Sequence, residues 1–195
     1  MIIGVDIDGV LANRQEWDMT HAAQHFAISE GDRIDPSSYF IEGKFGITKD
    51  QASDYWGSFI WDYAENVEPM IGAAEALRKL KDDGHTIIIN TARWLSERND
   101  EQGARMRSAT EQWLKKHGLL CDKLVFAHHF YKDKLHVAKE LALDIHIDDL
   151  PREIELLAPS LPVLIFDNAY NQDFSLPNTR RVKSWDDLYK TISKM

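Results

Sequence analysis

The sequence lacks the features that define several large classes of protein. Its single cysteine, Cys121, can form no disulfide within the chain and leaves no cysteine cluster for zinc. No apolar run reaches the roughly 18 residues that cross a bilayer, so a membrane span is not expected. Residues 1–10 carry two acids inside an apolar run with no basic region before it, so a secretory signal is not expected either. Together these absences favour a cytoplasmic protein.

Motifs and charge for binding nucleotides or polyanions are also missing. The chain has neither a P-loop nor a G-x-G-x-x-G motif. Lys and Arg number 23 against 32 Asp and Glu, and residues 13–70 alone hold 4 basic and 11 acidic residues. Because polyanion binding depends on many Lys and Arg contacts to phosphate, we expect no nucleic acid polymer and no anionic membrane as a partner. A small anionic substrate neutralised by a metal ion stays open, as does a homodimer.

Apolar runs of strand length alternate with stretches of helical periodicity. The runs are Ile2–Ile7, Thr86–Ile89, Leu124–Ala127, Ile145–Ile147 and Val163–Phe166. The helical stretches are Ala73–Lys81, Arg98–Lys116, Lys134–Leu143, Pro151–Leu157 and Asp186–Ile192, the last with Ser184 as its N-cap. Strands that are apolar on both faces and alternate with helices are typical of a parallel sheet covered on both sides. The pattern predicts a three-layer, Rossmann-like α/β fold.

Residues 13–70 interrupt this alternation. The segment is too long for an ordinary loop between a strand and a helix, and Glu16–Phe26 and Lys49–Tyr63 have helical periodicity. It is rich in aromatic residues, namely Trp17, Phe26, Tyr39, Phe40, Phe45, Tyr55, Trp56, Phe59, Trp61 and Tyr63. We predict a small helical cap at 13–70, inserted after the first strand of an α/β core formed by residues 1–12 and 71–195. Such a cap overhangs the carboxyl ends of the strands, where open α/β sheets bind ligands.

Two acidic pairs follow apolar strands. Asp6 and Asp8 end the first strand, where Gly9 lets the chain turn away, and Asp148 and Asp149 end a later one. Two neighbouring carboxylates do not both ionise cheaply without a cation. Four carboxylates at one sheet edge therefore predict a hard dication, Mg²⁺, and the alternative is a solvated acidic rim.

Groups suited to an anion occur between these pairs. Thr91 follows the second strand, with a hydroxyl and free backbone N–H groups. Lys132 and Lys134 stand at the start of the helix that precedes Asp148, where the helix dipole disfavours a cation. An acidic pair, a threonine, a lysine and a second acidic pair, each near a strand end, together predict phosphoryl transfer.

These motifs resemble those of a known superfamily. Asp6 to Val10, Thr91, Lys134 and the Asp148–Asp149 pair are similar to the four motifs of the haloacid dehalogenase superfamily, and the match covers the whole core. The insertion resembles that superfamily's C1 cap. Residues 66–73, Asn-Val-Glu-Pro-Met-Ile-Gly-Ala, and the aromatic run before them resemble the 5'(3')-deoxyribonucleotidase-like branch, which includes the cytosolic 5'-nucleotidases of type C.

The resemblance implies catalytic roles. Asp6 would attack phosphorus and carry a transient aspartyl phosphate. Asp8 would protonate the leaving oxygen and then activate water. Lys134 would neutralise the phosphate oxygens; it is preferred to Lys132 because its distance along the chain to Asp148 suits the superfamily pattern.

The resemblance also implies binding roles. Thr91 and the backbone around Ala92 would hold phosphate oxygens. The metal ligands would be Asp6, the backbone carbonyl of Asp8 and Asp148, with Asp149 in direct or indirect support. Arg93 and Trp94 come next along the chain and are candidates to face the substrate.

The substrate class is a separate question. Aromatic side chains of the cap could stack on a nucleobase, whereas Trp56, Phe59 and Tyr63 could equally form the inner stripe of a helix. We expect one or two of the ten aromatics to line a pocket. The leading hypothesis is a Mg²⁺-dependent 5'-nucleotidase acting on (deoxy)nucleoside monophosphates. The alternatives are a phosphatase for another small phosphomonoester such as a sugar phosphate, a polynucleotide 3'-phosphatase, and a binding module without activity.

Overall fold

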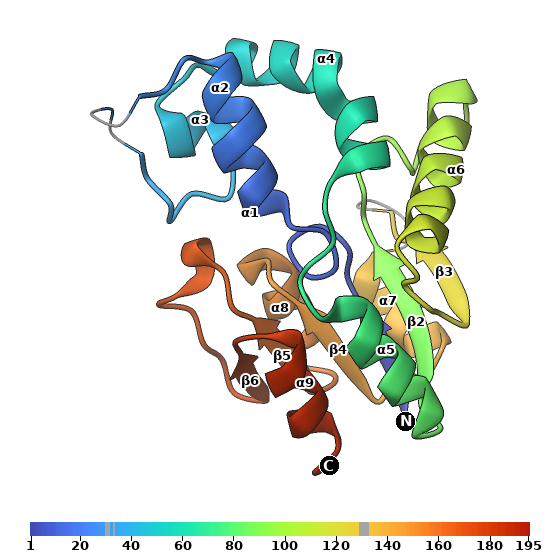
Figure 1. The fold of residues 1–195 in the computed structure, drawn as a ribbon. Coiled ribbons are helices and arrows are strands. Elements are labelled where there is room, and N and C mark those ends of the chain that lie inside the picture. Colours follow the sequence, from blue (N-terminus) through green and yellow to red (C-terminus); the bar gives the residue numbers. More distant parts are fainter. Residues whose placement is uncertain (30–31, 33, 129–132) are drawn as a thin grey trace.

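The computed structural model describes residues 1–29, 32, 34–128 and 133–195 (Figure 1). Within this part of the chain six strands form one parallel sheet in the order β3-β2-β1-β4-β5-β6. The strands are β1 (Ile2–Val5), β2 (Thr86–Thr91), β3 (Lys123–Phe126), β4 (Ile145–Asp148), β5 (Val163–Phe166) and β6 (Thr179–Val182). The predicted Rossmann-like α/β fold is confirmed.

The strands differ from the sequence prediction in several places; β3 begins and ends one residue earlier than predicted, and β4 continues to Asp148. Strand β1 ends at Val5 rather than Ile7, because the chain curls back on itself directly after it. Strand β2 continues to Thr91, so this threonine is the strand's last residue and does not follow it. Strand β6 was not predicted, since the sequence Thr-Arg-Arg-Val contains no apolar run, although Val182 is fully buried.

Helices cover both faces of the sheet. One face packs against α5 (Ala73–Asp82), α6 (Glu101–Lys116) and α9 (Trp185–Ile192), and the other against α7 (Lys134–Glu140) and α8 (Pro151–Leu157). Side-chain caps fix several helix starts. Asp100 accepts a hydrogen bond from the Gly103 amide, so α6 begins later than the predicted Arg98. Ser184 caps α9 as predicted.

A group of helices lies between β1 and α5, above the carboxyl edge of the sheet (Figure 1). The helices are α1 (Arg14–Trp17), the π-helical turn η1 (Asp18–Ala22), α2 (Ala23–His25), α3 (Ile41–Phe45) and α4 (Lys49–Asn66). They share a small apolar core that includes Ile41, Phe45 and Tyr55. The division at residue 71 into core and cap stays a prediction.

The end of α4 is tied to the rest of the molecule. Trp113 of α6 is buried, and its indole Nε1 donates a hydrogen bond of 2.7 Å to the carbonyl of Val67. Arg105 of α6 lies over the Trp61 ring, 4.0 Å from its centroid, and contacts Glu65.

Within the described residues no helix has both the length and the hydropathy to cross a membrane.

Candidate active site

The loop after β1 brings Asp6 and Asp8 to the carboxyl edge of the sheet. The amides of Leu11 and Ala12 both donate to the carbonyl of Ile7 at 2.8 Å, which closes a tight curl. Gly9 has φ of 92°, and a Cβ placed on it would collide with the Asp149 carboxylate. Only glycine therefore allows the curl to approach the end of β4 this closely.

Lys134 holds two of the predicted carboxylates together. Its Nζ lies 2.9 Å from Asp6 Oδ1 and 2.7 Å from Asp148 Oδ2, and all three side chains are buried. Asn90 supports this arrangement from β2, since its side-chain amide donates to the Lys134 carbonyl at 3.1 Å. The alternative Lys132 lies outside the described residues.

Asp6, Asp148 and Asp149 form a group suited to a metal ion. Each offers one carboxylate oxygen, and these oxygens lie within 4.8 Å of one another. Asp149 Oδ1 is buried without a hydrogen-bond partner among the described residues, while its other oxygen accepts from the Tyr170 hydroxyl. An all-oxygen donor set with a buried, unsatisfied carboxylate oxygen fits Mg²⁺.

The electrostatics of this group support the same interpretation. Burial, followed by Asp148 and Asp8, raises the pKa of Asp6 to about 7 in spite of Lys134. Burial and the charges of Asp148 and Asp6 raise the pKa of Asp149 well above its ordinary value. Three acids beside one lysine therefore leave a local excess of negative charge, which a dication compensates.

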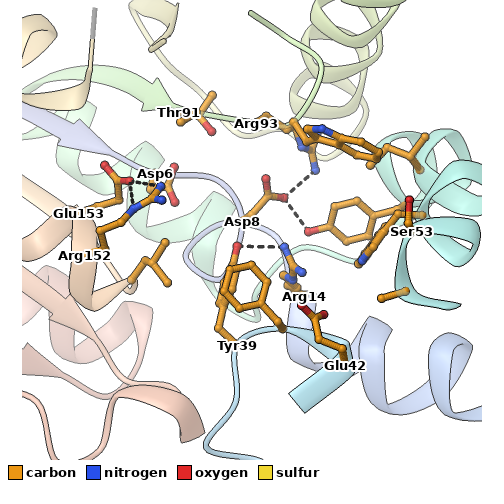
Figure 2. A pocket seen from close by; sticks show the side chains of 18 of the residues that line it. Asp6, Asp8, Arg14, Tyr39, Glu42, Ser53, Thr91, Arg93, Arg152 and Glu153 are labelled. Carbon is orange, nitrogen blue, oxygen red and sulfur yellow. Dashed lines mark hydrogen bonds and ion pairs between the residues drawn. The ribbon is translucent and has the colours of Figure 1, made fainter. Parts of the chain in front are cut away.

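Asp8 has different surroundings. Its Oδ1 accepts hydrogen bonds from the Tyr63 hydroxyl at 2.6 Å and from Arg93 Nη2 at 3.1 Å (Figure 2). Burial raises the pKa of Asp8, but Arg93, Tyr63 and Arg14 outweigh it, and the pKa falls below its ordinary value. The Asp8 carboxylate is not part of the acidic group suited to a metal, and the metal contact from its backbone carbonyl stays a prediction.

Thr91 and Ala92 lie where a phosphate could meet them. Thr91 Oγ1 is buried and has no hydrogen-bond partner among the described residues. Both residues line a cavity of about 550 Å³ that also contains Asp6, Asp8 and Lys134. A buried hydroxyl without a partner is costly unless a ligand satisfies it, which favours an anion at this position.

The insertion supplies the other wall of this cavity. Of its ten aromatic residues four line the cavity, namely Tyr39, Phe40, Trp56 and Tyr63. The predicted stripe on α4 is therefore divided, because Phe59 packs on Tyr55 and does not line the cavity. Trp94, 54% exposed, lines the cavity from the loop after β2.

Sequence reasoning missed several members of the site. Arg14, Tyr170 and Glu153 were not singled out, although Arg14 and Glu153 line the cavity and Tyr170 contacts Asp149. No spacing in the sequence signals them, since Tyr170 lies 21 residues from Asp149 along the chain and meets it only through the packing of β4 on β5.

Solved structures of phosphatases and hydrolases share this fold. Similar solved structures include a predicted phosphatase from Clostridium acetobutylicum, with 18% identity, TM-score 0.62 and coverage of 100% of this chain and 98% of that one. They also include the D,D-heptose 1.7-bisphosphate phosphatase from B. bronchiseptica complexed with magnesium and phosphate, at 13% identity, TM-score 0.57 and coverage of 100% and 99%. A HAD-superfamily hydrolase from Ehrlichia chaffeensis is similar at 13% identity and TM-score 0.55, with coverage of 99% and 96%.

The family follows from the sequence match. The model of the family described as "5' nucleotidase, deoxy (Pyrimidine), cytosolic type C protein" matches residues 1–195, and the chain belongs to this family. A search of curated proteins found no match to this chain. Membership of the nucleotidase family identifies the protein as a phosphoric monoester hydrolase.

Proposed function

We propose that the protein is a Mg²⁺-dependent 5'-nucleotidase that hydrolyses (deoxy)nucleoside monophosphates through an aspartyl phosphate on Asp6. The observation that carries this proposal is the contrast between two carboxylates in one cavity. Asp6 forms an ion pair with Lys134, which also contacts Asp148. Asp8 instead accepts hydrogen bonds from Tyr63 and Arg93. Two acids with different surroundings can take different roles in one reaction.

Asp6 is the nucleophile in the first half of the reaction. A carboxylate oxygen of Asp6 attacks phosphorus, the bond from phosphorus to the ester oxygen breaks, and the leaving oxygen takes a proton from Asp8. Lys134 and the Thr91 hydroxyl are placed to bind the oxygens of the transferring phosphoryl group. The negative charge of the bound phosphate favours the protonated form of Asp8, because a nearby like charge raises a carboxyl pKa.

Asp8 acts as a base in the second half. Its carboxylate takes a proton from water, the water oxygen attacks phosphorus, and the bond to Asp6 breaks to release phosphate and restore the free carboxylate. Arg93 and Tyr63 lower the pKa of Asp8 in the free site. The ionised carboxylate that results is the form that accepts the proton in this step. Both halves therefore use the same residue in opposite protonation states.

Asp6, Asp148, the Asp8 carbonyl and Asp149 would hold the metal ion. Bound Mg²⁺ would supply charge neutralisation for the phosphate oxygens and would favour the ionised form of Asp6, whose pKa is otherwise about 7. Lys134 contacts both Asp6 and Asp148 and so links two of these ligands.

The cavity suits a nucleoside as the leaving group. Its volume of about 550 Å³ lies in the range of small-molecule sites, and aromatic side chains form part of its lining. An aromatic face binds a base by stacking, which contributes about 1–3 kcal/mol per base. The family description adds pyrimidine deoxynucleotides as the class to test first and a cytosolic location as the one to expect.

Phosphate release from a substrate panel tests this proposal. The panel contains ribonucleoside and deoxyribonucleoside 5'-monophosphates, several sugar phosphates and a short oligonucleotide with a 3'-phosphate, each assayed with Mg²⁺ and with a chelator. We expect Mg²⁺-dependent release from the nucleoside monophosphates in preference to the sugar phosphates and the oligonucleotide. Inactivity across the panel would contradict the proposal and favour a binding module.

A sugar phosphatase is the second candidate. The lining of the cavity includes the polar side chains of Glu42, Lys49 and Ser53, which could bind sugar hydroxyls. One of the similar structures is a heptose bisphosphate phosphatase. Release from sugar phosphates alone would keep the mechanism on Asp6 and replace the nucleotide by a sugar.

A further inference from the structure

Arg14 is a cation inside the cavity that the reaction scheme does not use. It stands at the start of α1, and its guanidinium carbon lies 4.3 Å from the centroid of the Tyr39 ring and 5.1 Å from that of Trp56. Its Nη1 donates to the Tyr39 hydroxyl at 2.9 Å, while its Nε is buried without a hydrogen-bond partner among the described residues. Aromatic contacts therefore hold the guanidinium in place, and N–H groups such as that of Nε are available to donate hydrogen bonds to a ligand.

Arg14 shares its nearest carboxylate with a second cation. Asp18 Oδ2 lies 3.8 Å from Arg14 Nε but only 2.7 Å from Lys44 Nζ. Lys44 and Asp18 are both fully buried, so their closer ion pair is the one that neutralises the aspartate. Arg14, which is partly buried, is left with the longer contact to this aspartate.

The other basic groups of the cavity lie nearer to acids of their own. Lys134 contacts Asp6 and Asp148 within 3 Å, and Arg93 contacts Asp8 at 3.1 Å. Arg152 contacts Glu153 at 2.8 Å. Lys49 is exposed at the start of α4. Among the described cations that line this cavity and pair with an acid, Arg14 has the longest ion-pair distance, 3.8 Å.

The position of Arg14 relates it to the leaving group. In Figure 2, Asp6 lies to the left of Asp8, whereas Arg14 lies below Asp8, beside Tyr39. Because Asp8 would protonate the leaving oxygen, the space beyond Asp8 belongs to the part of the substrate that departs. Burial lowers the pKa of Arg14, but Tyr39 and Asp18 outweigh it and the pKa rises, so the charge persists.

We propose that Arg14 binds a second phosphate carried by the leaving group, and that the enzyme therefore prefers nucleoside bisphosphates to nucleoside monophosphates. The inference rests on the proposed function for the identity of the leaving group. A guanidinium binds phosphate with paired, charge-assisted hydrogen bonds, and the second phosphate supplies the negative charge that Asp18 does not. Arg14 is then a specificity residue, which touches substrate but not the reacting atoms.

Binding to an inactive variant tests this inference without depending on turnover. Asp6→Asn protein and the double variant Asp6→Asn/Arg14→Gln are titrated with thymidine 5'-monophosphate and deoxythymidine 3',5'-bisphosphate in the presence of Mg²⁺. We expect the single variant to bind the bisphosphate at least about 10-fold more tightly than the monophosphate. Arg14→Gln should weaken bisphosphate binding about 10- to 100-fold and monophosphate binding less than about 3-fold.

Two further variants separate this contact from general effects. Arg14→Lys keeps the charge, so it should retain part of the preference for the bisphosphate. The preference should be smaller than with arginine, because lysine cannot form bidentate hydrogen bonds to a phosphate. Lys49→Gln removes another cation of the same cavity and should leave the preference unchanged. Thermal unfolding of each variant checks that the insertion is still folded.

The outcomes distinguish the inference from the proposed function. Equal affinity for the two ligands, an equal loss with both ligands in Arg14→Gln, or the same loss in Lys49→Gln would overturn the inference. If the wild-type enzyme releases no phosphate from any nucleotide, the proposed function fails, and the binding preference still decides the role of Arg14.

Discussion

Asp6 and Asp8 stand two residues apart, yet the protein gives them opposite electrostatic environments. Burial and neighbouring acids raise the pKa of Asp6, whereas Arg93 and Tyr63 lower that of Asp8. The curl after β1 causes this difference, because it turns the Asp8 side chain toward α4 while Asp6 stays over the sheet edge. The division of labour in the proposed mechanism follows from this local geometry.

The role of Asp6 gives the first prediction. Asp6→Asn keeps the size of the side chain but removes the nucleophilic charge, so we expect kcat to fall by at least about 1,000-fold. The variant should stay folded, because Lys134 keeps its ion pair with Asp148 at 2.7 Å. Phosphate release and thermal unfolding of the same preparation check both points. Substantial turnover by this variant would rule out an aspartyl phosphate on Asp6.

Tyr63 gives a second prediction at the same scale. Tyr63→Phe removes the hydroxyl that donates to Asp8 at 2.6 Å and keeps the ring that lines the cavity. Asp8 loses one of the groups that orient it, so we expect kcat to fall about 10-fold with KM changed less than about 3-fold. Steady-state kinetics on the best substrate of the panel measure this split. A change confined to KM would instead assign Tyr63 to substrate binding.

At the scale of elements, one buried ion pair joins η1 to α3. Lys44 of α3 meets Asp18 at 2.7 Å, and both side chains are excluded from solvent. Lys44→Met leaves the aspartate buried with only the more distant Arg14, so we expect a loss of about 3–5 kcal/mol in the free energy of unfolding. Denaturant titration measures the loss.

An exposed pair serves as the matched control for Lys44. Lys190 meets Asp186 at 2.6 Å on the surface of α9, where solvent screens the attraction. Lys190→Met should therefore leave the stability unchanged within error. Equal effects of the two substitutions would show that burial does not determine the strength of the Lys44 pair.

The elements also show how far the sequence could predict this molecule. Strands β1, β2, β4 and β5 are buried and apolar, so periodicity found them, together with the strand-end positions of Asp6 and Asp148. Strand β6 could not be predicted from apolar runs, because it contains two arginines. The partners of Asp8 and Asp149 could not be predicted either, since a hydroxyl such as that of Tyr63 or Tyr170 is recognised only once the helices are packed.

At the scale of the whole molecule, charge is distributed unevenly. The chain carries a net charge of −9, and three of its acids, Asp6, Asp148 and Asp149, come together at the sheet edge, where two of them contact the buried Lys134. Concentrating like charges in a buried site costs stability, which a bound dication recovers. The stability of the entire fold should therefore depend on the metal.

Metal binding gives the last prediction. At a Mg²⁺ concentration about 100 times Kd, binding to the folded state alone adds about 2.7 kcal/mol, which corresponds to a rise in Tm of about 5–10 °C for a chain of this size. A chelator should remove both this rise and the activity. Asp149→Asn should reduce the rise, because it removes one of the three converging carboxylates. Asp82→Asn changes an exposed acid on α5 and should retain the full rise. An identical Tm with Mg²⁺ and with chelator would show that Asp6, Asp148 and Asp149 do not form a metal site.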